Sequence, residues 1–279
     1  MKRYAFKPKS RWREFLGEKF IQLNALSAIL VIILIFTFIF KEALPIFTDD
    51  YVKEDAGVSK LVFKQQWSEG SDASWKWQPE SDEPKFSLLP LFIGTLKAAL
   101  VAMLFGAPLG IGAAVYTSEF ASRRAREIIK PAIEMLAGIP SVVLGFFALM
   151  VMATVLQKTF GFTYRLNAIN AGIALGLAII PIIFTVAEDA MTAVPSSLRD
   201  AATALGANPW QVSYTMVLPA ALPGIAAGLV LGFGRAIGET MIVLMASGNA
   251  AILSASLADS VRTFSATIAA EMAEVVFGD

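Results

Sequence analysis

The chain of 279 residues contains no cysteine and no histidine. Their absence excludes disulfides, iron–sulfur clusters, thiolate nucleophiles and zinc sites built on these two residue types. It also excludes the catalytic triads that use imidazole as the base. No loop motif for a metal site made of oxygen ligands is visible either. The residue inventory therefore points away from an enzyme and away from a metalloprotein.

Charge is also scarce in this sequence. Only 16% of the residues are charged and 56% are hydrophobic, whereas a typical soluble domain has about 25% charged residues. This balance is typical of a helical membrane protein. We therefore expect an all-α integral membrane protein in contact with the lipid bilayer, and no nucleic-acid partner.

Long runs without charge predict five transmembrane helices. A charged side chain costs about 2.5–3.5 kcal/mol at the centre of a bilayer, and a span needs about 20 apolar residues. With short flanks added, the uncharged runs predict spans over 21–44, 89–118, 133–157, 167–191 and 219–247. The last four spans lie in a predicted transmembrane core, 89–248.

The charged segments predict the orientation. Segment 1–20 is rich in Lys and Arg, and the loop 119–132 is basic as well, whereas the segment 45–88 has an excess of Asp and Glu. Because basic loops stay in the cytoplasm, we expect the N-terminus and the loop 119–132 inside, and 45–88 outside. The formal net charge of zero is thus a cancellation between a basic inside and an acidic outside.

Two predicted external segments have different patterns. Segment 45–88 is polar and carries Trp67, Trp75 and Trp77, so we expect an ordered loop or small cap with its tryptophans at the membrane interface. A docking surface for an external partner is the alternative. In 249–279, apolar residues recur at the spacing of an amphipathic helix. They are Val261, Phe264, Ile268, Met272 and Val275.

The predicted cytoplasmic segment 192–218 carries the most informative motif. Its charge-free part predicts a short helix, a turn and a second short helix, with a re-entrant segment as the alternative. The motif joins an acidic residue, two alanines and a glycine to a later Leu-Pro pair. Its residues are Asp200, Ala201, Ala202, Gly206, Leu218 and Pro219.

This pattern resembles the EAA loop of ABC importer permeases, in which a Glu stands where this chain has Asp200; an ordinary connector is the alternative. The resemblance implies that the two short helices sit in a cleft of a cytoplasmic ATPase. The chain itself has no Gly-x-x-x-x-Gly-Lys motif, and no Lys follows a Gly anywhere. We therefore expect no cofactor on this chain, and ATP and Mg²⁺ on a separate ATPase subunit.

Arg235 and Glu239 are the only charges in the last predicted span. They are four residues apart, which predicts that they share one helix face. Ionisable residues inside a span indicate a functional site, although a structural Arg–Glu bridge is the alternative. A guanidinium suits a tetrahedral oxyanion because its fork donates two parallel hydrogen bonds. We expect Glu239 to hold Arg235 when no anion is present.

Several motifs resemble the PstC-type permeases of bacterial phosphate ABC transporters, and the resemblance covers about 90–279. They are 94–96, 132–145, 232–241, 248–249 and 265–274. The resemblance implies the type I ABC importer permease fold and phosphate import by alternating access. It also implies transport roles for Arg235, Glu239 and Thr240. Sulfate or molybdate as the cargo, and an ATP-independent anion carrier, are the alternatives.

The same resemblance implies three partners: an ABC ATPase dimer, a second homologous permease subunit and an extracytoplasmic phosphate-binding protein. Members of the family usually have a sixth span after the external amphipathic segment. This sequence ends at Asp279 without one, so five helices are expected, with the last helix missing.

Of the remaining charges, we expect Lys97 to snorkel at the external end of the second span. Glu134 is expected at the start of the third.

Overall fold

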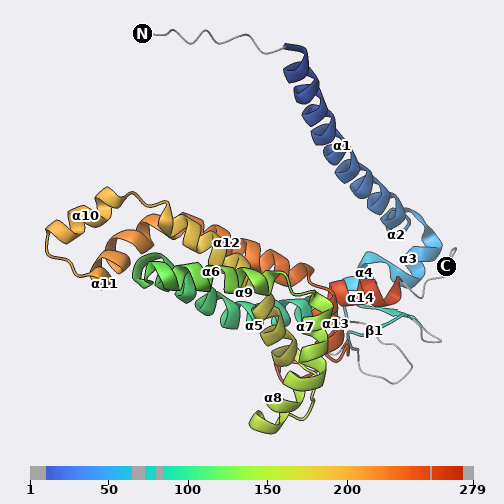
Figure 1. Ribbon diagram of the computed structural model, residues 1–279. Coiled ribbons are helices and arrows are strands. Elements are labelled where there is room, and N and C mark those ends of the chain that lie inside the picture. Colours follow the sequence, from blue (N-terminus) through green and yellow to red (C-terminus); the bar gives the residue numbers. More distant parts are fainter. Residues whose placement is uncertain (1–10, 65–72, 80–83, 252, 273–279) are drawn as a thin grey trace. The chain divides into compact units, whose positions relative to one another are not determined.

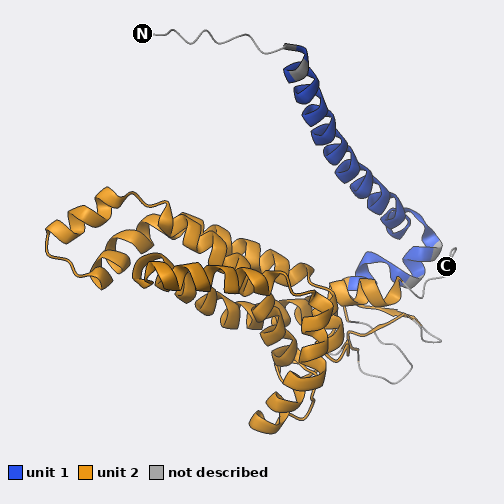
Figure 2. Cartoon of the chain, in the orientation of Figure 1, with its two compact units in different colours: residues 1–61 blue, residues 62–279 orange. Residues whose placement is uncertain are grey.

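The computed structural model describes residues 11–64, 73–79, 84–251 and 253–272. The chain divides into two compact units, 1–61 and 62–279, which Figure 2 shows in different colours. In the described residues, five helices are long and apolar enough to cross a membrane. Each unit is described by itself.

Unit 1 consists of one long apolar helix followed by short ones. The long helix is α1 (Arg11–Ala43), and α2 (Pro45–Thr48), α3 (Asp50–Ala56) and the start of α4 (Val58–Val62) follow it. The large apolar side chains of α1 are exposed on all sides, as expected for a helix whose surroundings are lipid. The predicted span 21–44 lies almost entirely within α1, which begins ten residues earlier.

Unit 2 is built around three long helices. They are α5 (Leu89–Val115), α9 (Ala168–Thr192) and α12 (Leu218–Gly238), with α9 packed against both others (Figure 1). Small residues let these helices approach closely. A Cβ on Gly172 of α9 would lie 2.4 Å from Cβ of Val101, and one on Gly224 of α12 would lie 2.3 Å from Cβ of Ala190.

The third predicted span, 133–157, is wrong at its start. The chain forms a separate helix, α6 (Arg123–Ala137), breaks at 138–140 and then continues through α7 (Ser141–Phe147), the π-helix η2 (Ala148–Met152) and α8 (Ala153–Phe160). Pro140 is the N-cap residue of α7, with a φ of −58° and a ψ of 138°, and it has no backbone N–H to donate to the helix that precedes it. The membrane-crossing candidate is therefore 141–160, and Glu134 lies on α6.

The last predicted span, 219–247, is wrong at both ends. The short helix α11 (Pro209–Val212) runs through the π-helix η3 (Ser213–Val217) into α12, so the helical segment begins at Pro209. It ends at Gly238, and α13 (Met241–Ala246) is separate. The first predicted short helix is present as α10 (Ser196–Ala204). Pro219 lies in the first turn of α12, which begins at Leu218 directly after the π-helix, so the helical segment is continuous through this proline.

Two strands and one short helix lie at one end of unit 2. Strand β1 (Trp77–Gln78) pairs antiparallel with β2 (Lys85–Phe86), and α14 (Phe264–Glu271) accounts for part of the predicted amphipathic helix. Val261 precedes α14 in a bridge to Gly248, and Val275 lies outside the described residues. We call this the β1 end; α10 and α11 mark the opposite, α10 end (Figure 1).

The tryptophans of the predicted external segment have protein partners. The indole N–H of Trp77 donates to Oε1 of Glu271 at 2.7 Å, and its ring packs edge-on against Phe86. Trp75 donates to the carbonyl oxygen of Val62 at 3.2 Å. Both side chains therefore fix local structure, and Trp67 lies outside the described residues.

Candidate functional site

The turn between α10 and α11 is held by its own backbone chemistry. Gly206 has a φ of +85°, a left-handed conformation that a residue with a Cβ resists. Asn208 and Gln211 then form a reciprocal capping box, with both N–H···O distances at 2.9 Å. The capping box satisfies two backbone donors at the start of α11. The two short helices thus keep a defined angle to each other.

The residues of the predicted coupling motif fall on two sides of α10. Ala202 is buried, with 3% of its surface exposed, whereas Asp200 and Ala201 are exposed. Leu218 is half-buried at the start of α12 and Pro219 is exposed. The small side chain of Ala202 lets α10 lie against the bundle, and Asp200 and Ala201 face away from it.

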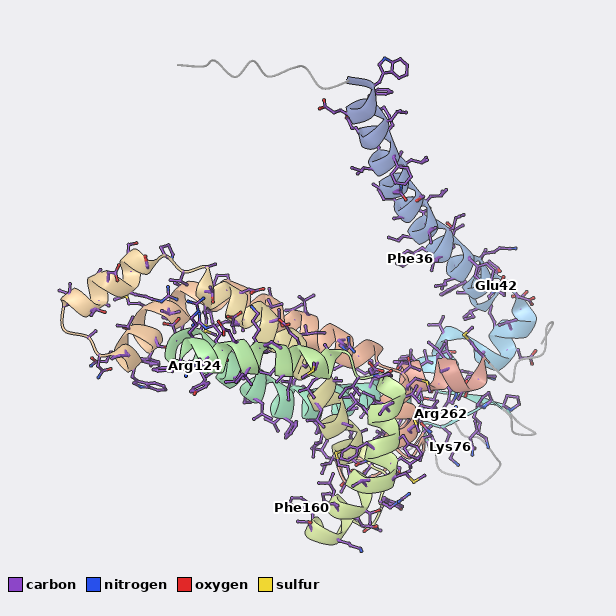
Figure 3. All side chains as sticks on the ribbon, viewed as in Figure 1. Phe36, Glu42, Lys76, Arg124, Phe160 and Arg262 are labelled. Carbon is purple, nitrogen blue, oxygen red and sulfur yellow. The ribbon has the colours of Figure 1, made fainter. Side chains whose placement is uncertain are left out.

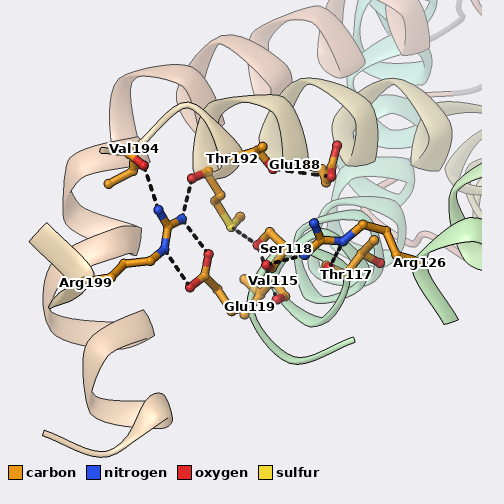
Figure 4. A network of polar contacts seen from close by, with 10 residues as sticks. Val115, Thr117, Ser118, Glu119, Arg126, Glu188, Thr192, Val194 and Arg199 are labelled. Carbon is orange, nitrogen blue, oxygen red and sulfur yellow. Dashed lines mark hydrogen bonds and ion pairs between the residues drawn. The ribbon is translucent and has the colours of Figure 1, made fainter. Parts of the chain in front are cut away.

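An ion pair that sequence reasoning missed ties α10 to the end of α5. The π-helix η1 (Tyr116–Phe120) carries Glu119, whose side chain is 8% exposed. Arg199 of α10 donates to both of its carboxylate oxygens, from Nε at 3.2 Å and from Nη2 at 2.8 Å (Figure 4). The hydrogen bond to Glu119 raises the pKa of Arg199 above its ordinary value. The pair is bidentate and largely shielded from water.

The same guanidinium also caps α9. Arg199 donates from Nη1 to the carbonyl oxygen of Val194 at 2.6 Å and from Nη2 to that of Met191 at 2.8 Å. These carbonyls belong to the last turn of α9 and the residues after it, where a helix leaves its acceptors unpaired. One arginine therefore connects α5, α9 and α10. The sequence pattern did not indicate this role, because Arg199 and Glu119 lie at the edges of uncharged runs, where charged residues are expected.

Helix α6 is tied to the same cluster by two more cations. Lys130 donates to Oε2 of Glu188 at 2.8 Å and lies 3.5 Å from Oδ1 of Asp189, both on α9. This hydrogen bond to Glu188 raises the pKa of Lys130. Arg126 donates to the carbonyl oxygens of Thr117 and Ser118 at 2.9 and 2.7 Å. The α10 end of unit 2 is therefore a connected polar framework (Figure 4).

Arg235 and Glu239 both lie at the end of α12. Arg235 lies in the last turn of α12, but Glu239 follows the helix with an extended backbone, φ −70° and ψ 131°. The backbone carbonyl of Glu239 instead accepts a hydrogen bond from Oγ of Ser265 at 2.7 Å. In the described part of the chain, no ion pair joins the two side chains. The helix break follows Glu239, and a shared helix face for the two side chains stays a prediction.

Helix α12 has a packed face and an open face. A Cβ on Gly232 would lie 2.7 Å from Cγ1 of Ile183, so this glycine is needed for helix contact. A Cβ on Gly234 or Gly238 would meet no atom within 4 Å. Arg235 is exposed beside these two glycines, and Glu239 and Thr240 are half-buried at the break. The open face leaves the guanidinium accessible to a ligand or a second subunit.

Lys97 does not snorkel as expected. Only 9% of its surface is exposed, and Nζ donates to the carbonyl oxygens of Ser254 and, at 2.9 Å, Ser256. The same loop is held at the start of α9, where the N–H of Ala168 donates to the carbonyl oxygen of Asp259 at 3.1 Å. Lys97 thus fastens the loop after α13 onto the bundle. Backbone acceptors have no sequence signature, so this role could not be predicted.

Comparison with known proteins identifies the family. The model of the binding-protein-dependent transport system inner membrane component matches residues 106–270, which is more than half of the chain. The chain belongs to this family. The matched region contains α9 to α13, and with them both the α10 end and the break after α12.

Curated relatives of this permease cover most of it. A probable ABC transporter permease, YqgH of Bacillus subtilis, is 36% identical over 207 residues, which are 74% of this chain and 66% of the relative. The phosphate transport system permease PstC of Mesorhizobium japonicum is 34% identical over 245 residues, 79% of this chain and 74% of the relative. The chain thus spans about two thirds to three quarters of their length.

A solved structure with a related arrangement is the inward-facing MetNI methionine ABC transporter. The match has a TM-score of 0.49 and 16% identity, and it covers 68% of this chain and 81% of that one. The family match and the five apolar helices confirm the predicted fold class, an all-α multi-pass membrane protein of the ABC importer permease type. The PstC-type resemblance is confirmed by relatives at 30–34% identity.

Proposed function

We propose that this permease moves inorganic phosphate across the cytoplasmic membrane as one subunit of an ATP-driven importer. The observation that carries the proposal is the open face of α12, on which Arg235 lies exposed beside a helix break. Relatives described as phosphate transport permeases support the choice of substrate. The site residues are Arg235, Glu239 and Thr240.

The chemistry of the proposed site is weak, reversible oxyanion binding. The guanidinium of Arg235 stays charged and presents paired donors that match two oxygens of a phosphate. Glu239 follows in the chain and repels the same anion, which limits its residence time. An importer needs such weak binding, because the substrate must leave on the other side of the membrane.

The α10 end is the proposed contact with an ABC ATPase dimer that holds ATP and Mg²⁺. Leu205 is 87% exposed, and Trp210 in α11 and Tyr214 in η3 are exposed as well. Aromatic residues are enriched at protein interfaces. The Arg199–Glu119 pair makes α10 move with α5 and α9, so a displacement of the ATPases would reach the transmembrane helices as a rigid-body motion.

The remaining proposed partners follow from the same assembly. A second homologous permease would cover the open face of α12, and together the two chains would enclose the translocation path. An extracytoplasmic phosphate-binding protein would dock at the β1 end. This orientation places the basic N-terminus and the α10 end in the cytoplasm.

The proposed function is tested by uptake of labelled phosphate into proteoliposomes that contain the whole transporter and its binding protein. Arg235→Ala is expected to lower ATP-dependent uptake at least about tenfold, the loss expected for a charge-assisted hydrogen bond worth 1.4 kcal/mol or more. Arg235→Lys is expected to retain part of the activity, since it keeps the charge and loses the fork. Full uptake by Arg235→Ala would overturn the site assignment.

The same assay separates the two alternatives. If excess sulfate or molybdate abolishes phosphate uptake, the site takes oxyanions in general and the substrate assignment is wrong. If an ion gradient drives uptake in the absence of ATP, the protein is a secondary carrier. We expect neither result.

A further inference from the structure

A cavity of about 420 Å³ lies at the β1 end of unit 2. It is lined by 76–78, by 249–251 and by Arg262. All of these residues belong to unit 2. The volume falls in the range of about 300–1,000 Å³ that is usual for small-molecule sites.

The two charged residues that line this cavity are cations, and the carboxylate of Glu271 pairs with one of them, Arg262. Lys76 and Arg262 both contribute to its wall, and Figure 3 shows their side chains at the same end of the molecule. None of the described residues that line it is acidic. Trp77, Gln78 and Asn249 also line it; the indole N–H of Trp77 donates to Glu271. A wall of this composition is complementary to a small anion.

Arg262 is held in place from two sides. Its Nη2 lies 2.9 Å from Oε1 of Glu271, the same oxygen that accepts the indole N–H of Trp77 at 2.7 Å. Its backbone lies so close to α5 that a Cβ on Gly94 would be 2.1 Å from its carbonyl oxygen. A guanidinium has five N–H donors, and the bond to Glu271 uses one of them. The cation is therefore fixed before any ligand arrives.

The opposite wall is equally well defined. Asn249 has a φ of +50°, a left-handed conformation that is uncommon for a residue with a side chain. Its Nδ2 donates to the carbonyl oxygen of Leu244 at 2.6 Å, and its backbone N–H donates to Oγ of Ser247 at 3.4 Å. Sparsely populated backbone conformations are maintained where the surroundings hold them, and they cluster at ligand sites.

We propose that this cavity is an entry site that binds a tetrahedral oxyanion between Lys76 and Arg262 before the anion reaches Arg235. The segment that carries Arg262 also reaches the helix break, since Ser265 donates to the backbone carbonyl of Glu239 at 2.7 Å. The segment that lines the entry site therefore also contacts a residue of the proposed translocation site. This inference rests on the proposed function, because it assigns a waiting position to the same substrate.

The experiment measures binding of labelled inorganic phosphate to the whole transporter in detergent, without the binding protein. All variants carry Arg235→Ala, which removes the translocation site. In this background Lys76→Gln is expected to weaken phosphate binding about fivefold. Arg262→Gln is expected to weaken it about tenfold or more, because the guanidinium of Arg262 is held in place and can donate two parallel hydrogen bonds. Lys158→Gln is the matched control, since Lys158 is an exposed lysine of α8 that does not line the cavity.

The outcomes separate this inference from the proposed function. Unchanged binding in both Lys76→Gln and Arg262→Gln, or no oxyanion binding once Arg235 is replaced, overturns the entry site. Because Lys76 is exposed, Lys76→Gln tests the site without removing the pair between Arg262 and Glu271. If sulfate or molybdate binds in place of phosphate with the same dependence, the entry site stands and the phosphate assignment fails.

Discussion

Single ion pairs at the α10 end differ sharply in their surroundings. Glu119 is 8% exposed in its pair with Arg199, whereas Arg123 and Glu127 are 94% and 66% exposed in theirs. Removing one partner of a shielded pair leaves an uncompensated charge, while an exposed pair contributes little because water and salt screen it. The two pairs therefore offer a matched comparison.

We predict that Glu119→Gln destabilises the chain by about 1–3 kcal/mol, the cost of leaving a partly buried charged donor without its acceptor. The measurement is the thermal inactivation midpoint of the detergent-solubilised transporter. Glu127→Gln is the control, with an expected cost below about 0.5 kcal/mol. Equal midpoints for the two variants would show that Arg199 does not depend on Glu119.

The helices show how much of the fold local sequence determines. Hydrophobicity is a local property, so the uncharged runs place all five apolar helices. The breaks depend on more distant contacts and were missed: α12 ends where Ser265, 26 residues later, donates to Glu239. In the same way, the burial of Lys97 was not predicted, because its partners are backbone carbonyl groups of a loop that is remote in the sequence. The site residues could be proposed from sequence, but the helix break that follows Glu239 could not.

Helix α12 also gives a prediction at this scale, since its glycines have different surroundings. Gly224→Ala is expected to destabilise the chain by about 1–3 kcal/mol, because the new Cβ overlaps that of Ala190 in a packed interface. Gly234→Ala is the control and should leave stability unchanged or raise it, because nothing lies within 4 Å. Thermal inactivation midpoints check both. A loss in Gly234→Ala alone would reverse the assignment of packed and open faces.

The orientation of the whole molecule is open to a direct test, since the chain has no cysteine of its own. Two single-cysteine variants are suitable, Thr159→Cys and Thr203→Cys. Thr159 lies at the end of α8 and Thr203 on α10, and both residues are exposed. With the N-terminus in the cytoplasm, a membrane-impermeant thiol reagent should label the cysteine at 159 in intact spheroplasts. It should label the one at 203 only after permeabilisation. The reverse pattern would invert the proposed topology.

The end of α12 at Gly238 has an electrostatic consequence for the whole transporter. The carbonyl groups of a helix's last turn carry roughly half a negative charge, and Arg235 lies in that turn. An anion on Arg235 would thus be attracted by one full charge and repelled by the helix end and by Glu239. The affinity of such a position is low by construction. A low affinity would shorten the time that an anion stays at this position, so the permease would gain turnover and leave the capture of scarce substrate to the proposed binding protein.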